Sequence, residues 1–151
     1  MTTMLDAAEE RSLAVDLFNH TWTLLRKEEP TEVDREAAVH CAHASAWHWS
    51  QVGNAQNRAI SEWQVSRVYS TLGRGEPAVH HARLALAFAE TVADAPWVLA
   101  CAYEGLARAY AVSGQSDIAL DWRDRAVEAL EGIDDPQDRA VVEEDIETLP
   151  L

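Results

Sequence analysis

The chain has 151 residues, of which 48% are hydrophobic and 25% are charged, and these proportions are typical of a single folded domain. Its 12 basic residues are outnumbered by 26 acidic ones, which gives a formal net charge of −14. Binding to nucleic acid or to an anionic membrane needs clustered lysine and arginine, and no basic run occurs. We therefore expect neither nucleic acid nor a membrane as a partner.

The cysteines and the N-terminal residues point to a cellular compartment. Cys41 and Cys101 lie in alanine-rich stretches and do not form a Cys-x-x-Cys motif, which is typical of a reducing environment. Residues 1–11 are acidic and lack the apolar run of a signal peptide. No stretch approaches the roughly 18 apolar residues of a membrane helix. We therefore predict a cytoplasmic protein.

Apolar spacing and turn residues predict an all-α protein of about seven helices joined by short connections. The predicted ranges, in chain order, are 7–27, 31–51, 55–72, 77–92, 96–113, 116–130 and 136–148. Thr31 with Asp34 is typical of a capping box, and Ser116 is a candidate N-cap. Short connections make successive helices antiparallel, and no alternating stretch rich in valine, isoleucine or threonine indicates a strand.

A tyrosine, a glycine and two alanines recur at the same offsets in two parts of the chain. The two copies are Trp63-x5-Tyr69-x3-Gly73-x4-Ala78-x3-Ala82-x2-Ala85 and Glu104-x5-Tyr110-x3-Gly114-x4-Ala119-x3-Arg123-x2-Ala126. Small side chains let two helices pack closely, and glycine permits the tight turn between them. This pattern resembles the tetratricopeptide repeat over residues 59–91 and 100–133.

The resemblance implies that residues 1–151 form one domain of antiparallel hairpins, stacked as a short right-handed superhelix. A helical pair at 7–52 would precede the two repeats, and the helix at 136–148 would cap the stack. Tyr110 follows Tyr69 by 41 residues, whereas the usual repeat is about 34 residues long. We expect the extra residues between Phe88 and Val98, as a longer helix or a loop. Such repeats are scaffolds for many partners, so the architecture alone names no ligand.

In tetratricopeptide stacks, residues six and two positions before the motif tyrosine face a concave groove. Those positions hold Trp63 and Arg67 in one repeat, and Glu104 and Arg108 in the next. The stack would set Arg67 beside Arg108 and Trp63 beside Glu104. Two neighbouring arginines could bind a carboxylate or phosphate. Alternatively, Glu104 and Glu62 would neutralise the arginines in a structural network, and the two roles can coexist.

Histidines gather on the second predicted helix. His40, His43 and Trp47 share one face because they are three and four residues apart, and His43 is the histidine expected to reach the groove. His40 and His43 could bind a divalent metal together with His81 and a nearby carboxylate. No His-x3-His or His-Glu-x-x-His motif occurs, so we predict no cofactor and keep His40, His43 and His81 as the candidate metal ligands.

Three functions follow from these residues. The first is a binding module that holds an anionic group of a peptide, a protein partner or a small metabolite. Its groove would be lined by His43, Trp47, Trp63, Arg67, Glu104 and Arg108. The second is a small helical enzyme, with or without a metal, in which His43, Glu62 and Glu104 are the acid–base residues. The third is a homodimer formed through the apolar first helix, with Leu13, Leu17, Phe18 and Leu24 at its face.

Overall fold

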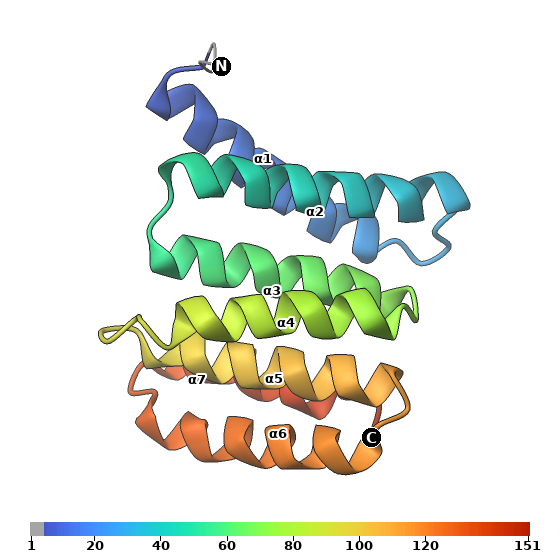
Figure 1. Ribbon diagram of the computed structural model, residues 1–151, viewed down its shortest axis with the longest axis vertical. Coiled ribbons are helices and arrows are strands. Elements are labelled where there is room, and N and C mark those ends of the chain that lie inside the picture. Colours follow the sequence, from blue (N-terminus) through green and yellow to red (C-terminus); the bar gives the residue numbers. More distant parts are fainter. Residues whose placement is uncertain (1–4) are drawn as a thin grey trace.

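The computed structural model describes residues 5–151, and these residues form seven α-helices, one short 3-10 helix and no strand (Figure 1). The all-α class is confirmed. Residues 1–4, which belong to the acidic N-terminal segment considered above, lie outside the described residues. The elements are α1 (Ala7–Leu25), α2 (Glu32–Val52), α3 (Ala55–Thr71), α4 (Gly75–Ala89), α5 (Pro96–Val112), α6 (Ser116–Ala129), η1 (Leu130–Gly132) and α7 (Pro136–Glu147).

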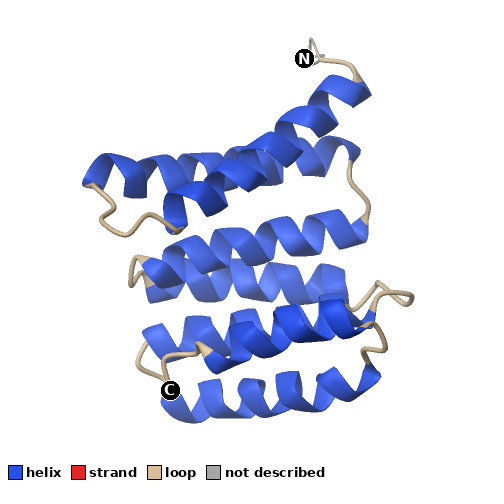
Figure 2. Cartoon of the chain, turned by 180° about the vertical axis from the view of Figure 1, so that it is seen from behind, coloured by secondary structure: helices blue, strands red, loops and turns tan. Residues whose placement is uncertain are grey.

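The first six helices pair as three antiparallel hairpins, α1/α2, α3/α4 and α5/α6, which follow one another along the long axis of the molecule (Figure 1). α5 packs against both α3 and α4, so the second and third hairpins are firmly joined. α7 turns back and lies against α5 and α6, on the side of the stack seen in Figure 2. No helix within residues 5–151 is long and apolar enough to cross a membrane.

Capping residues set several helix starts. Thr31 Oγ1 accepts a hydrogen bond of 3.1 Å from the backbone N–H of Asp34, and the Asp34 carboxylate accepts one of 2.9 Å from the N–H of Thr31. The predicted capping box is therefore confirmed. Ser116 is not the N-cap of α6, because Gly114 turns the chain with φ of 78° and Gln115 already stands at the cap position.

α4 begins at Gly75, two residues before the predicted start, and ends at Ala89. A Cβ on Gly75 would lie 2.9 Å from the Cα of Ser113, so the absence of a side chain lets α4 approach the end of α5. The extra residues of the second repeat form a loop over 90–95, and Pro96 starts α5. The insertion is thus a loop rather than a longer helix.

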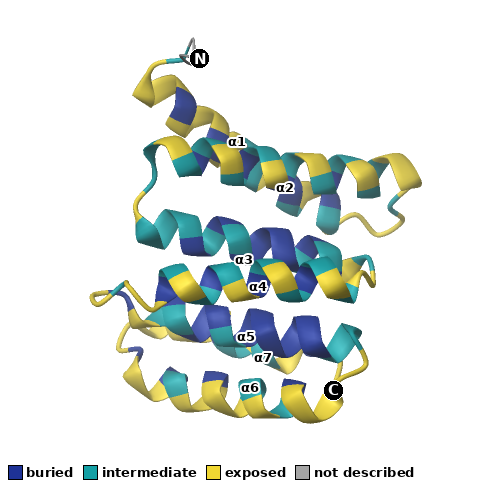
Figure 3. Ribbon diagram, in the orientation of Figure 1, coloured by how far each residue is buried: buried dark blue, intermediate teal, exposed yellow. Residues whose placement is uncertain are grey.

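α5 is the central helix of the stack, since it contacts α3, α4, α6 and α7. Eleven of its 17 residues are buried, and Figure 3 shows it as a nearly continuous dark band. Buried alanines on α4 and α6 let those helices pack closely on their partners, as the repeat pattern predicts. By contrast, α1 packs along α2 but approaches α3 only locally, which leaves room for pockets between α1 and the rest of the stack.

Candidate functional site

A buried carboxylate on the central helix holds the candidate site together. Glu104 of α5 is only 1% exposed. Its Oε2 accepts a 2.8 Å hydrogen bond from Nε1 of Trp63, and its Oε1 accepts a 2.7 Å bond from Nε of Arg108. The Arg67 guanidinium lies 3.7 Å from the same Oε1. A buried charge persists only with such partners, so these four residues form one unit across α3 and α5.

A glycine on α5 makes this arrangement sterically allowed. A Cβ on Gly105 would lie 2.9 Å from Cδ1 of Trp63, which is closer than real Cβ contacts. The missing side chain therefore lets the Trp63 indole lie against α5 and direct its N–H to Glu104.

Arg108 uses its guanidinium to anchor α7. One terminal nitrogen donates to the backbone oxygen of Asp145 at 2.8 Å and to Oγ1 of Thr148 at 2.9 Å. The other donates to the backbone oxygen of Thr148 at 3.3 Å. A cation at the C-terminal end of a helix also interacts favourably with the helix dipole. Arg108 thus makes the contacts of the structural network considered from the sequence.

Arg67 is bound far more loosely. Its guanidinium carbon lies 5.7 Å from the ring centre of Trp22 and 5.9 Å from that of Trp63. Both terminal nitrogens reach Oδ1 of Asp145, at 3.4 and 3.5 Å, beyond the usual range of N–H···O bonds. The side chain keeps 17% of its surface exposed. Arg67 is therefore a cation held by two aromatic rings. The N–H groups of its guanidinium are poorly used in hydrogen bonding.

Arg67 lines a cavity of about 530 Å³ between α1, α3 and α7, which we call the Arg67 pocket. Its volume is in the range of small-ligand sites, about 300–1,000 Å³. The pocket is lined at the end of α1 by Trp22, Leu25 and Arg26, on α3 by Trp63, Arg67 and Thr71, and at α7 by Val141, Glu144, Asp145 and Thr148. The walls from α1 and α7 were missed by sequence reasoning, because the groove positions of the repeat pattern concern only α3 and α5.

The surroundings of Asp145 disfavour the ionised form of its carboxyl group. Burial raises the pKa of its carboxyl, and the nearby charge of Glu104 raises it further, while Arg67 and Arg108 act in the opposite direction. The ionised form is therefore less favoured in the folded protein than in the unfolded chain, despite the two arginines.

A second cluster lies where α2, α3 and α4 meet. His81 Nδ1 and Glu62 Oε2 are 2.7 Å apart, and His43 Nε2 is 2.8 Å from the Tyr69 hydroxyl. The ring centres of His43 and His81 are 5.1 Å apart, and Tyr69 stacks on His81. Partial burial and the neighbouring His81 lower the pKa of His43. Glu62 therefore pairs with a histidine and not with the arginines.

The two clusters occupy different faces of α3. At about 100° per residue, Trp63 and Arg67 point roughly 100–140° away from Glu62. His43 accordingly lies beside Tyr69 rather than in the Arg67 pocket, and Trp47, one turn further along α2, is 63% exposed. The structure thus joins Trp63, Arg67, Glu104 and Arg108 and leaves His43 and Trp47 apart.

The positions of these side chains can also be compared with the predicted metal ligands and the predicted acid–base residues. Within residues 5–151, no group of three or more histidine, cysteine, aspartate or glutamate side chains is placed to hold a metal ion, and this includes His40, His43 and His81. His43 and Glu62 belong to the histidine cluster, whereas Glu104 is bound by Trp63 and Arg108. These three acid–base candidates do not meet in one pocket.

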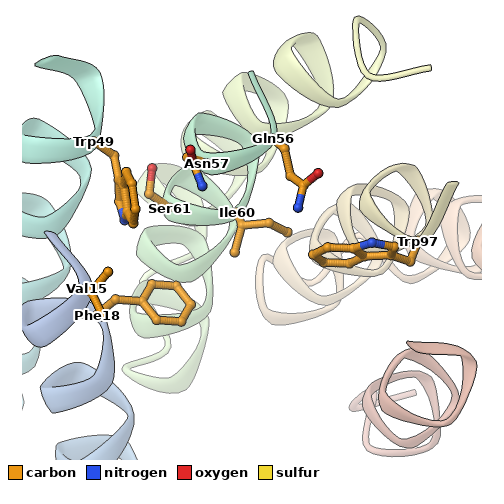
Figure 4. A pocket seen from close by; sticks show the side chains of 8 residues that line it. All are labelled: Val15, Phe18, Trp49, Gln56, Asn57, Ile60, Ser61 and Trp97. Carbon is orange, nitrogen blue, oxygen red and sulfur yellow. The ribbon is translucent and has the colours of Figure 1, made fainter. Parts of the chain in front are cut away.

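An apolar pocket of about 180 Å³ lies between α1, α3 and the start of α5. Figure 4 shows the Ile60 side chain between Phe18 and Trp97, with Trp49 beside Ser61 on one side and Gln56 near Trp97 on the other. Trp49 is only 8% exposed and also lines this pocket.

The proposed dimer face on α1 is only partly exposed. Leu24 is buried at 6% exposure, Leu17 and Phe18 are half-buried, and Leu13 is 39% exposed. Of these four side chains, Leu13 is the exposed one, and Val15 of the same helix is also 39% exposed.

Comparisons of the chain with protein-family models, with curated proteins and with solved structures find no match. The resemblance to tetratricopeptide repeats stays a prediction from the sequence pattern.

Proposed function

We propose that the protein is a cytoplasmic binding module of tetratricopeptide type, in which Arg67 holds an anionic group of a peptide, a protein partner or a small metabolite. The proposal rests on the surroundings and contacts of the Arg67 guanidinium. The guanidinium lies beside the rings of Trp22 and Trp63 and faces a cavity of about 530 Å³. Its contacts with the carboxylates of Asp145 and Glu104 are long, at 3.4 to 3.7 Å.

The chemistry of the guanidinium favours a carboxylate or phosphate. It carries five N–H donors in a planar fork, and a bidentate acid group would give it two short, charge-assisted bonds. Two indole rings restrict the orientation of Arg67, so less freedom is lost when a ligand binds. Glu104 does not compete for this role, because its oxygens are already bound by Trp63 and Arg108.

The pocket wall carries charges of both signs. Arg26 adds a second cation to Arg67, and Glu144 and Asp145 add two carboxylates. Charges further than about 8 Å away are largely screened at physiological ionic strength. The net charge of −14 therefore weakens the long-range attraction of an anion, whereas binding at short range depends on the charges of the pocket wall.

The repeat assignment is supported by the packing of α3 to α6. Gly73 and Gly114 have φ of 73° and 78° at equivalent turns, and Ala78 and Ala119 are completely buried at equivalent positions. Helix pairs of this kind commonly present a binding surface along their first helices.

Native mass spectrometry of the untagged protein, purified from the cells that make it, tests the proposal. We expect an anionic compound or peptide to be retained by the wild type and lost in Arg67→Gln. Arg74→Gln, at an exposed arginine in the turn before α4, is the matched control and should retain it. Equal retention by wild type and Arg67→Gln would contradict the proposed role of Arg67.

A further inference from the structure

α7 presents a carboxylate of the chain itself to the cation of the proposed site. Oδ1 of Asp145 faces both terminal nitrogens of Arg67. Asp145 comes from the C-terminal helix, which follows the repeats and lies on the same side of the stack as α1 (Figure 2). The Asp145 carboxylate therefore occupies the position in which the acid group of a ligand would meet Arg67.

The attachment of α7 does not depend on this side chain. Arg108 binds the backbone oxygens of Asp145 and Thr148, and Val142 and Leu149 are buried at 1% and 8% exposure. The carboxylate of Asp145 contributes only the two long contacts to Arg67. A rotation of the Asp145 side chain would consequently free Arg67 while α7 stays docked.

The contact between Asp145 and Arg67 is also weak in energetic terms. The nitrogen–oxygen distances of 3.4 and 3.5 Å exceed the usual range of hydrogen bonds, so the pair gains little from direct hydrogen bonding. Glu104 lies close by and repels the Asp145 carboxylate. An external carboxylate that approaches both terminal nitrogens at normal hydrogen-bond length would replace two long contacts by two short ones.

We infer that Asp145 is an internal competitor, and that a ligand carboxylate binds by displacing the Asp145 carboxylate from Arg67 while Arg108 keeps α7 in place. This inference rests on the proposed function, and it names the ligand group as a carboxylate. It also makes Asp145 the residue that limits the affinity of the site.

Asp145→Asn tests the inference, because the variant removes the competing charge and keeps the backbone oxygen that Arg108 binds. Glu147→Gln is the matched control: it changes the charge by the same amount on the same helix, at an exposed residue that does not line the pocket. The probes are acetate, an N-acetylated alanine tetrapeptide with a free C-terminal carboxylate, and the amide of that peptide. Calorimetric titration measures their affinities.

We expect Asp145→Asn to bind the free-carboxylate peptide about tenfold more tightly than the wild type does, and Glu147→Gln to change the affinity less than about twofold. The affinity for the peptide amide should not increase. If the affinity increases for acetate as well as for the peptide, the acid group alone accounts for the effect. If it increases for the peptide alone, contacts with the peptide chain are also needed.

If Asp145→Asn binds no more tightly than the wild type while Arg67→Gln loses binding, the competitor role is wrong and the proposed function stands. If the wild type and Asp145→Asn both fail to bind any of these carboxylates at millimolar concentration, the inference is wrong, because it names the ligand group as a carboxylate. The proposed function is then decided by the native mass spectrometry of wild type and Arg67→Gln. An equal gain in Glu147→Gln would also overturn the inference, since it would reduce the effect to overall charge.

Discussion

Nε1 of Trp63 donates a 2.8 Å hydrogen bond to Oε2 of Glu104, and this contact joins the first helices of the two successive hairpins that carry the repeat. Both residues occupy the same offset before the repeat tyrosine, 41 residues apart along the chain. The bond thus makes the buried charge of Glu104 dependent on the exact stacking of α3 on α5, and it holds the Trp63 indole beside Arg67.

Trp63→Phe should lower the free energy of unfolding by about 1–3 kcal/mol. Phenylalanine keeps most of the apolar contact but leaves one oxygen of a buried carboxylate without its donor. Urea unfolding measures the change. Trp47→Phe is the control, because Trp47 is 63% exposed and should change stability by less than about 0.5 kcal/mol. A similarly small effect of both substitutions would show that the bond to Glu104 is unimportant.

Gly105→Ala should destabilise the protein, although the same change inside a helix normally stabilises it by about 1 kcal/mol. The added Cβ would meet Cδ1 of Trp63 at 2.9 Å and push the indole from Glu104. Thermal unfolding measures the destabilisation, and the NMR signal of the Trp63 indole N–H reports the loss of its bond to Glu104. Gly132→Ala is the comparison, since a Cβ there has no neighbour within 4 Å. A rise in melting temperature for Gly105→Ala would contradict the close approach described above.

Arg108→Met should cost about 3–5 kcal/mol of stability, because it leaves the Glu104 carboxylate without its closest cation. It should also release α7, so amide hydrogen exchange of residues 136–147 should rise before that of α5. Arg123→Met is the control: Arg123 pairs with exposed Asp124, and loss of such a pair costs at most about 1 kcal/mol. Unchanged exchange in α7 would mean that other contacts hold this helix.

The histidine cluster should make stability fall on mild acidification. Because partial burial and His81 lower the pKa of His43 below its ordinary value of 6.5, the unfolded chain takes up a proton at a higher pH than the folded protein does. Stability should therefore decline from about pH 6.5 down to the folded pKa and then level off. Urea unfolding at several pH values measures this dependence. His43→Gln should remove this part of the pH dependence, whereas His20→Gln, at an exposed residue of α1, should not. An identical slope in wild type and His43→Gln would contradict the assignment.

Much of the fold could be predicted because its signals are local. Thr31 and Asp34 mark a helix start within four residues, and the glycines at 73 and 114 mark turns that need positive φ. The neighbourhood of Trp63 and Glu104 could be predicted as well, since equivalent offsets in stacked hairpins fall side by side. Ser116 shows the limit of such signals: a serine near a helix start is a cap only if the preceding turn leaves it there, and the turn at Gly114 does not.

The full pocket could not be predicted, because it depends on contacts between parts of the chain that share no pattern. Nothing in residues 136–148 indicates that Asp145 would reach Arg67, 78 positions earlier. The approach of Trp22 to Arg67 depends on the oblique course of α1, which departs from the repeat. His43 was expected in the groove from its helical face alone, and its actual neighbour, Tyr69, is selected by how α2 packs on α3.

NMR titration of the indole Nε1–H signals tests the central claim, carboxylate binding at Arg67, most directly. With the N-acetylated alanine tetrapeptide, we predict saturable shifts of the Trp22 and Trp63 signals, little change for Trp47 and Trp122, no response to the peptide amide, and loss of the shifts in Arg67→Gln. Equal shifts with acid and amide, or unchanged shifts in Arg67→Gln, would contradict the assignment of Arg67 as the anion-binding residue.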